Sequence, residues 1–547
     1  MTKKRPPIPV PRIKGQADTV AVQEMPIIEV NGLGVRAGQK TLVRDVSFVI
    51  APGERIGLIG ASGSGKSVTA QAIASLLPTQ LTPQGSVRIN CPAMPTALIE
   101  QAGGECQYLE VIGASERTLA KVRGATIGMI FQDPRAALDP LVRVGDALAS
   151  ELGIPWYQRG RRQDPRVISA LEDVGLMATH AHRRPHELSG GQCQRIGIAI
   201  ALANEPALLI ADEPTTALDA LTQAQIIELL KQRLDSQNTA LLFISHDLAL
   251  TQEMCENGLI MDRGEIVARG AIRAVMDDPH PAVVTLSRAI ENRSDAFVPR
   301  CAPSQSSTDQ TRQAVIFEAV TRTHRGGETP TLDDISLVIP EGGRVGIVGA
   351  SGAGKTTLVR LIAGLNRPTA GKITVNGRVQ MVFQHPKASF NPRLPLRVSL
   401  EESLNDAAPD LSAEERAERI TSALAHVDLP PDSAERYPSA FSGGQLQRLA
   451  IARAVLGEAD ILIADEPVSA LDIAVRRQVL DTLESHAKGR TLIMVSHDFA
   501  PVAQLCDTVV VMSSATIVEA GPTETLFTDP KDPYTARLVA ATRFKCL

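Results

Sequence analysis

The same ordered set of motifs occurs twice in this sequence, and the repeat limits the possible folds more than any other feature. GASGSGKS, LSGGQ and IADEP follow one another in the first half, and GASGAGKT, FSGGQ and IADEP follow in the same order in the second half. The two IADEP strings are 253 positions apart, as are the two SGGQ strings. Self-similarity over such a distance predicts two duplicated domains rather than a single large one.

The length and composition leave room for these two domains. The 547 residues are 44% hydrophobic and 21% charged, which excludes a disordered or collagen-like chain. The first half carries about 37 extra residues between its GKS and Gln132, compared with Gln384 in the second half, and we expect this insertion to be mostly irregular. The predicted organisation is a basic proline-rich tail (1–25), a first domain (26–291), a polar linker (292–313) and a second domain (314–547).

Several functional classes are disfavoured by charge and composition. The net charge of −5 gives no global attraction to nucleic acid, and no run of 18 apolar residues predicts a membrane-spanning helix. The seven cysteines lack CxxC spacing, which disfavours disulfide frameworks and zinc sites and indicates a reducing compartment. The basic N-terminus lacks the apolar core of a secretory signal. We therefore expect a cytoplasmic protein whose tail is solvated, or alternatively touches an anionic membrane surface.

Short apolar runs in each half predict an α/β fold. ALLIAD, ALLFISH, DILIAD and TLIMVSH are almost continuously apolar and end in polar residues. Strands of a parallel sheet that is buried on both faces have this pattern. We expect each half to contain a mostly parallel core sheet, a β-rich N-terminal part and a helical subdomain that carries the SGGQ string.

The two GxxxxGK[ST] strings predict phosphate-binding loops. Each follows an apolar run, RIGLIG or RVGIVG, and precedes a helical stretch, which is the context that this motif requires. In such a loop the glycines let backbone amides surround phosphate oxygens, and the lysine neutralises their charge. The predicted phosphate ligands are Gly60, Ala61, Ser62, Gly63, Ser64, Gly65, Lys66 and Ser67, and Gly349, Ala350, Ser351, Gly352, Ala353, Gly354, Lys355 and Thr356.

An Asp-Glu pair ends one apolar run of each half, and a histidine ends another. Asp212 and Asp465 would lie at the carboxyl edge of a sheet, where they can join the hydroxyls of Ser67 and Thr356 in holding Mg²⁺. The glutamates that follow them, Glu213 and Glu466, can polarise a water that attacks a γ-phosphate. His246 and His497 follow these glutamates by 33 and 31 positions and are expected to contact the γ-phosphate.

The SGGQ strings predict a second kind of anion site. Each places a serine and two glycines before a helical stretch, where amides and the helix dipole favour an anion. Because each half already has a phosphate loop, we expect this second site to face the nucleotide of another domain. Its predicted residues are Ser189, Gly190, Gly191 and Gln192, and Ser442, Gly443, Gly444 and Gln445.

Taken together, these motifs resemble the nucleotide-binding subunits of ABC transporters, with two such domains fused in one chain. The resemblance implies ATP and Mg²⁺ as cofactors, Walker A loops in the glycine-rich strings, and signature motifs in the SGGQ strings. It also implies Q-loops at Gln132 and Gln384, which would contact both the metal and the reacting groups, and D-loops at Ala217–Asp219 and Ala470–Asp472. The implied catalytic residues are Glu213, Glu466, His246, His497, Gln132 and Gln384, and the implied Mg²⁺ ligands are Ser67, Gln132, Asp212, Thr356, Gln384 and Asp465.

One branch of this family is the closer match. RGATIGMIFQDPRAALDP, FQHPKASFNPR and the two tails DDPHPAVVTLSRA and TDPKDPYTARLVAAT resemble the oligopeptide, dipeptide and nickel uptake proteins. The resemblance implies head-to-tail domains, two integral-membrane permease subunits, an extracytoplasmic solute-binding protein and a position at the cytoplasmic face of the inner membrane. The implied cargo is a peptide, nickel or an opine-like metal chelate.

The chain departs from the family at several places. GVRAGQK at 34–40 lacks the aromatic residue on which family members stack adenine, and His324 is the nearest equivalent in the second half. The linker has only Cys301, so we expect no iron–sulfur cluster.

Two other classes of tandem ATPase compete with the transport interpretation. A soluble translation factor with two ABC domains would carry a long, charged helical arm between them, whereas the linker here is short and polar. A DNA-repair ATPase would need zinc-binding CxxC pairs within its domains, and this chain has none.

Overall fold

A computed structural model of the chain describes most of both halves. The described residues are 25–61, 63–90, 108–215, 218, 220–245, 247–284, 286–287, 312–323, 329–384, 386–468 and 473–544. The predicted N-terminal tail except Met25, the predicted linker up to residue 311, and the individual predictions at Ser62, Ala217, Asp219, His246, Cys301, His324 and Ala470–Asp472 lie outside them.

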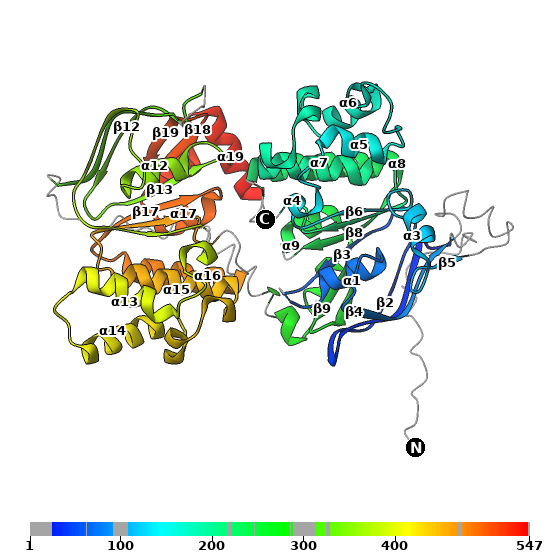
Figure 1. Ribbon diagram of the computed structural model, residues 1–547, viewed down its shortest axis with the longest axis horizontal. Helices are drawn as coiled ribbons and strands as arrows, with labels where there is room; N and C mark the ends of the chain where they lie inside the picture. The colour runs from blue at the N-terminus through cyan, green and yellow to red at the C-terminus, as the bar shows by residue number, and fades with distance from the viewer. Residues whose placement is uncertain are drawn as a thin grey trace, which may run out of the picture.

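A six-stranded sheet forms the core of each half (Figure 1). In the first half the strand order is β10-β9-β3-β8-β7-β6, and all neighbours are parallel except β10 and β9. In the second half the order is β15-β16-β17-β13-β18-β19, with only β18 and β19 antiparallel. The strands are β3 (Arg55–Ile59), β6 (Ile127–Ile130), β7 (Leu208–Asp212), β8 (Ala240–Ser245), β9 (Asn257–Asp262), β10 (Glu265–Ala271), β13 (Arg344–Gly349), β15 (Val379–Val382), β16 (Ile461–Asp465), β17 (Thr491–Ser496), β18 (Thr508–Ser513) and β19 (Thr516–Pro522).

The central strands are buried on both faces, as their apolar runs predict. In β7, Leu209 belongs to one hydrophobic cluster and Ile210 to another, because successive side chains point to opposite faces of a sheet. In β17, Leu492 and Ile493 divide in the same way. The predicted α/β class, with a mostly parallel core sheet in each half, is confirmed.

Helices cover both faces of each core sheet. In the first half α1 packs on one face, and α5, α6 and α7 pack on the other (Figure 1). In the second half α12 packs on one face, and α13, α14 and α15 pack on the other. The helices are α1 (Lys66–Ile73), α3 (Glu116–Val122), α4 (Pro134–Ala137), α5 (Val144–Glu151), α6 (Pro165–Asp173), α7 (Gly190–Leu202), α8 (Ala220–Gln237), α9 (Leu248–Met254), α10 (Ile272–Val275), α12 (Lys355–Ile362), α13 (Leu396–Ala407), α14 (Ala413–His426), α15 (Gly443–Leu456), α16 (Ile473–His486), α17 (Phe499–Leu505), α18 (Thr523–Thr528) and α19 (Pro533–Phe544).

A smaller antiparallel sheet flanks the α1 or α12 side of each core. Its strand order is β2-β1-β4-β5 in the first half and β12-β11-β14 in the second. These strands supply the β-rich N-terminal part of each domain. They are β1 (Ile28–Ala37), β2 (Lys40–Ile50), β4 (Leu81–Asn90), β5 (Tyr108–Glu110), β11 (Gln313–Arg322), β12 (Leu332–Pro340) and β14 (Ala370–Val375).

The insertion of the first half is more regular than the sequence suggests. Its described part contains β5, which pairs with β4, and α3, whose Leu119 and Val122 are buried in the core. The expectation of a mostly irregular insertion is therefore wrong for this part. The burial of Leu119 and Val122 in this cluster holds the short helix against the core.

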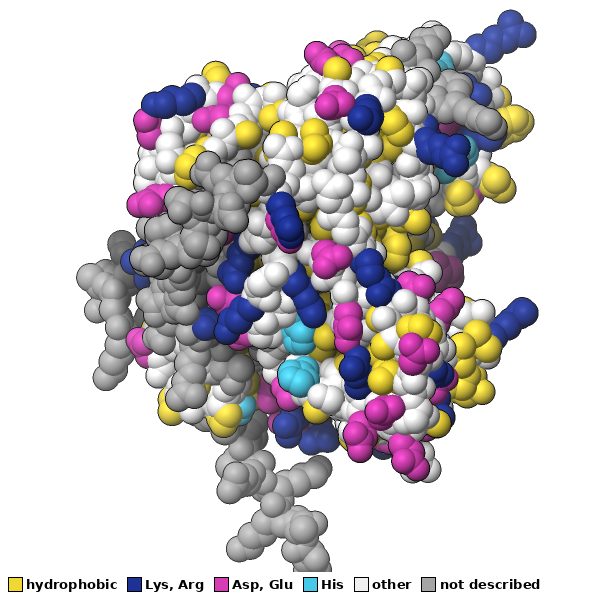
Figure 2. Space-filling view, turned by 90° about the vertical axis from the view of Figure 1, so that its left-hand side faces the viewer, with side chains coloured by type: hydrophobic (Ala, Val, Ile, Leu, Met, Phe, Trp, Pro, Cys, Tyr) yellow, Lys and Arg dark blue, Asp and Glu magenta, His cyan; other side chains and the backbone are white. Residues whose placement is uncertain are grey.

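The two halves contact each other through helices. The C-terminal helix α19 of the second half packs against α8 of the first (Figure 1). Figure 2 shows the outer face of the second half, on which acidic and basic side chains are intermixed. Within the described part of the chain, no helix combines the length and apolar character needed to cross a membrane.

The two-faced burial of the core sheet makes a first prediction. Replacing Leu492, which is fully buried in β17, by alanine should lower the free energy of unfolding by about 2–5 kcal/mol, because the cavity cannot collapse inside a sheet packed on both faces. Leu365→Ala is the matched control, since that side chain is 57% exposed and should lose less than about 0.5 kcal/mol. Urea unfolding of both variants measures the difference, and equal losses would contradict the assigned core.

Candidate functional site

A tight glycine-rich loop joins the central strand to a helix in each half. Gly65 and Gly354 precede α1 and α12 with φ of 105° and 101°, a conformation that side chains with a Cβ avoid. A Cβ on Gly60 would lie 2.2 Å from the carbonyl oxygen of Met261, so the backbone passes too close to β9 for any other residue. The loops therefore have the shape that the motif predicts.

A buried lysine lies inside each loop. Lys66 donates hydrogen bonds from Nζ to the carbonyl oxygens of Gly60 (2.8 Å) and Ala61 (2.9 Å). Lys355 donates in the same way to Gly349 (2.8 Å) and Ala350 (2.9 Å). The two lysines are 6% and 5% exposed, so each ammonium group depends on these carbonyls in place of water.

The first loop also contains a polar atom whose partner is missing among the described residues. Ser64 Oγ is buried there and has no hydrogen-bond partner. Together with the lysine and the helix N-terminus, this hydroxyl fits an anionic ligand that brings its own acceptors, such as the phosphates of ATP. The equivalent residue of the second loop is Ala353, so this feature belongs to the first half alone.

The carboxylates at the strand ends lie beside the loop hydroxyls. Ser67 Oγ donates to Asp212 Oδ1 at 3.1 Å, and Thr356 Oγ1 donates to Asp465 Oδ1 at 3.4 Å. Burial raises the pKa of Asp212 to about 6 and that of Asp465 also to about 6. A hard divalent cation prefers such oxygen donors and would offset the cost of burying the charge, so the donor set fits Mg²⁺.

The following glutamates have a strained backbone. Glu213 and Glu466 adopt φ of 47° and 48°, which is uncommon for residues other than glycine. Their amides donate to Ile244 O (2.9 Å) and Val495 O (3.0 Å) of the neighbouring strand. These bonds fix the strained turn, which turns the glutamate away from the direction of the strand.

A glutamine meets this glutamate in both halves. Gln132 Nε2 donates to Glu213 Oε2 at 2.9 Å, and Gln384 Nε2 donates to Glu466 Oε2 at 2.8 Å. In the second half His497 Nδ1 also lies 3.4 Å from Glu466 Oε2. Burial by itself would raise the pKa of Glu466, but the hydrogen bond and charge of His497, the charge of Lys355 and the amide of Gln384 together lower it. This carboxylate is held in its ionised form.

The SGGQ motifs form capped helix N-termini. Ser189 Oγ accepts from the amide of Gln192 (3.2 Å), and the Gln192 side chain accepts from the amide of Ser189 (3.0 Å). Ser442 and Gln445 repeat this reciprocal cap at 3.3 and 2.9 Å. Gly190 and Gly443 leave open space beside the cap, since an added Cβ would meet no atom within 4 Å.

Neither half brings its own SGGQ motif to its own glycine-rich loop. The loop of the first half begins α1, and its SGGQ motif begins α7, on the opposite face of the core sheet (Figure 1). The second half separates α12 and α15 in the same way. Each half therefore assembles loop, aspartate, glutamate and glutamine into one cluster and keeps its SGGQ motif apart.

Two arginines that the sequence does not single out connect the glutamine segments to the SGGQ helices. Arg135, three residues after Gln132, donates to the carbonyl oxygen of Leu188, just before Ser189, at 3.0 Å. In the second half the direction is reversed, and Arg453 of α15 donates to Ser389 O at 2.6 Å. Because each bond joins segments 53 to 64 residues apart, no local pattern reveals it.

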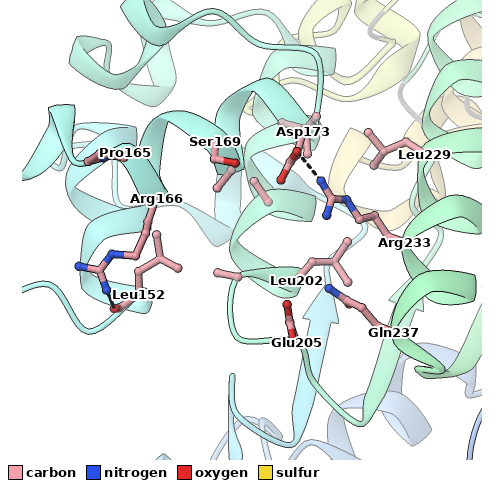
Figure 3. A pocket seen from close by; sticks show the side chains of 14 residues that line it. Leu152, Pro165, Arg166, Ser169, Asp173, Leu202, Glu205, Leu229, Arg233 and Gln237 are labelled. Carbon is pink, nitrogen blue, oxygen red and sulfur yellow. Dashed lines mark hydrogen bonds and ion pairs between the residues drawn. The ribbon is translucent and has the colours of Figure 1, made fainter.

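A separate cavity of about 430 Å³ lies among α6, α7 and α8 of the first half (Figure 3). Arg233 of α8 forms an ion pair with Asp173 of α6 across it. None of the predicted site residues lines this cavity, so the site chemistry lies elsewhere.

Comparison with known proteins agrees with this geometry. A family model described as ABC transporter matches residues 43–216 and 332–469, one in each half and together more than half of the chain. The chain belongs to the ABC transporter family. It accordingly binds ATP and is an ATPase.

Its relatives match almost from end to end. The peptidoglycan transport ATP-binding protein YejF of Agrobacterium fabrum is 36% identical, over 94% of this chain and 96% of its own length. The oligopeptide transport ATP-binding protein OppD of Mycobacterium tuberculosis is 33% identical, over 94% and 98%. The glutathione import ATP-binding protein GsiA of Salmonella typhimurium is 34% identical, over 94% and 89%. The tandem arrangement is thus shared with these proteins.

Solved structures add support for the fold alone. A chain in the complex of an archaeal ribosomal stalk protein and ribosome recycling factor matches 86% of this chain and 86% of its own length, with a TM-score of 0.56 and 21% identity. A structure named RNase-L Inhibitor matches 89% and 92% with a TM-score of 0.57, also at 21% identity. At this identity the likeness carries no statement about activity.

The buried aspartates make a prediction about pH. The pKa of Asp212 is about 6 in the fold against its ordinary value of 3.8, so its protonated form is favoured and stability is lost as pH rises from about 4 through 6. An asparagine at this position would mimic the protonated form. At pH 7.5, without nucleotide or Mg²⁺, Asp212→Asn should therefore raise the free energy of unfolding by about 3 kcal/mol. Near pH 4.5 most of this gain should disappear.

Urea unfolding at both pH values measures this difference. Asp465→Asn should behave alike, because burial raises its pKa equally. Asp333→Asn is the control, since that side chain is exposed. A gain in the free energy of unfolding that is the same at both pH values would show that burial does not raise the pKa of this carboxylate.

Proposed function

We propose that this protein is the ATP-hydrolysing subunit of an importer for peptides, with two ATP sites that each combine residues of both halves. The observation that carries the proposal is the duplicated cluster of lysine, aspartate, glutamate and glutamine, which is complete in both halves. A protein that needed only one active site would tolerate loss of a residue from the other cluster.

Each proposed site assigns separate tasks to its residues. Amides of the glycine-rich loop and the lysine would bind the phosphates, and the serine or threonine hydroxyl, the aspartate and the glutamine would hold Mg²⁺. Mg²⁺, when bound, neutralises charge on the phosphate oxygens. Glu213 and Glu466 orient the attacking water and accept its proton, a task for which the lowered pKa of Glu466 keeps a carboxylate available. His497, whose Nδ1 lies beside Glu466 Oε2, positions that carboxylate, and the sequence assigns both His497 and His246 to the γ-phosphate.

The separation of the SGGQ motifs from their own loops supports composite sites. Figure 1 shows α12 and α7 in the upper part of that view, and α15 and α1 in the lower part. A head-to-tail closure would place Ser442 against the nucleotide of Lys66, and Ser189 against that of Lys355. The capped helix N-termini then provide amides and a positive dipole end for the γ-phosphate.

Exposed apolar residues after each glutamine support a membrane partner. Val142 and Leu394 hold equivalent positions in the two halves and are 36% and 40% exposed, and Leu141 beside Val142 is 77% exposed. They follow the Gln132 and Gln384 segments, which Arg135 and Arg453 connect to the SGGQ helices. We infer that two integral-membrane permeases dock here, at the cytoplasmic face of the inner membrane, and that an extracytoplasmic protein delivers the solute.

Peptides are the favoured solute class. The three relatives described above are named for the transport of peptidoglycan, oligopeptides and glutathione, all of which contain peptide bonds. Nickel and opine-like chelates, which the sequence resemblance also allows, have no such support. Recognition of the individual peptide would lie in the permeases and the solute-binding protein.

Two equal sites predict a specific pattern of hydrolysis. Glu213→Gln and Glu466→Gln should each lower steady-state ATP turnover by about half or more, and the double variant should lower it by about 10²- to 10⁴-fold, the usual contribution of a general base. Glu228→Gln, on the exposed face of α8, is the matched control and should leave turnover unchanged. If one single variant abolishes activity and the other has no effect, the sites are not equivalent.

The transport proposal predicts loss of uptake. Cells that carry Lys66→Ala plus Lys355→Ala should lose import of labelled di- and oligopeptides, because neither loop can then neutralise phosphate charge. Cells with Lys372→Ala, an exposed lysine of β14, should import normally. Unchanged peptide uptake in the double variant would remove this substrate class.

A further inference from the structure

A tyrosine from the C-terminal helix touches the glycine-rich loop of the second half. The amide of Ala350 donates a hydrogen bond to Tyr534 Oη at 2.7 Å. Tyr534 lies in the first turn of α19, 184 positions later in the chain. The loop is thus held by an element outside the strand–loop–helix unit that forms it.

The position of this tyrosine is itself fixed. The Asp532 carboxylate caps α19 by accepting from the amides of Tyr534 (2.8 Å) and Thr535 (3.2 Å). Glu519 of β19 accepts from the amides of Lys531 (2.9 Å) and Asp532 (3.1 Å). The Tyr534 ring packs against the hydrophobic core of the second half. The hydroxyl is therefore presented to the loop by a rigid support.

Ala350 is held through both polar groups of its backbone. Its amide donates to Tyr534, and its carbonyl oxygen accepts from Lys355 Nζ at 2.9 Å. When a nucleotide binds, Lys355 would exchange loop carbonyls for phosphate oxygens. The bond to Tyr534 does not involve the lysine, so it can hold the loop in shape through that exchange.

Among the described residues, the first half has no equivalent of this bond. Pro281 and Pro533 each begin the helical turn after the last strand, and the residues two places later, Val283 and Thr535, are both fully buried. This register places Ala282 where the second half has Tyr534. The methyl side chain of Ala282 cannot accept a hydrogen bond from the first loop. Lys66 nevertheless donates to the carbonyl oxygens of that loop, as Lys355 does in the second.

We propose that Tyr534 is a positioning residue for ATP binding by the second loop, so that the site containing Lys355 binds ATP more tightly than the site containing Lys66. This inference rests on the proposed assignment of both loops as ATP sites. A loop that is already held in shape loses less conformational freedom when its ligand binds. The two sites then differ in affinity while sharing the residues of hydrolysis.

The test isolates one site at a time in the full-length chain. Lys66→Ala leaves only the second site, and Lys355→Ala leaves only the first. The affinity for the fluorescent analogue trinitrophenyl-ATP with Mg²⁺ is measured in each background, with and without Tyr534→Phe. Tyr157→Phe, an exposed tyrosine of the first half, is the control.

Tyr534→Phe should weaken binding about 3- to 10-fold in the Lys66→Ala background, the effect of one lost hydrogen bond, and leave binding unchanged in the Lys355→Ala background. In the otherwise natural chain the KM for ATP should rise while kcat stays constant, and the variant should still unfold in a single cooperative urea transition. Equal weakening at both sites, or none at either, would overturn the role of Tyr534. Undiminished binding by Lys66→Ala plus Lys355→Ala would instead overturn the site assignment, and this inference with it.

Discussion

Burial of a lysine ammonium group inside its own loop is the constraint on which each half depends. A charge withdrawn from water must find polar partners, and here the partners are backbone carbonyls of the loop that carries the lysine. The loop can curve around the lysine only because the backbone of Gly60 passes close to β9 and Gly65 adopts a left-handed conformation. The curved loop in turn determines how the central strand connects to the first helix.

The same burial explains why the site is poised for a charged ligand. A buried cation and a buried carboxylate whose pKa is raised to about 6 lie at one edge of the sheet in each half. The lysine and the carboxylate attract each other, and a nucleotide phosphate with a divalent cation would add a further partner of opposite charge for each. The strained backbone at Glu213 and Glu466 adds a second local cost at the same place. The residues of the proposed catalytic site therefore lower the stability of the fold.

Sequence reasoning predicted the parts that depend on local pattern. The apolar runs ending in Asp212 and Asp465 are fully buried strands, and the glycine-rich strings are the expected loops. The bond between Gln132 and Glu213, 81 residues apart, was not predicted, because the family resemblance implied only that each residue contributes to the site. The regular structure within the insertion and the bond between Ala350 and Tyr534 were missed as well. Each depends on a contact between distant segments that no periodicity encodes.

The central claim is that one chain closes two ATP sites across its halves, and cross-linking tests it most directly. Ala61→Cys with Ser442→Cys, in a Glu213→Gln, Glu466→Gln background that retains ATP, should form a disulfide that ATP promotes. The product should keep the 58.3 kDa mass of a single chain. Ala61→Cys with Ser189→Cys, a pair within one half, should not cross-link. Products of only twice that mass, or linkage of the pair within one half instead, would contradict the account.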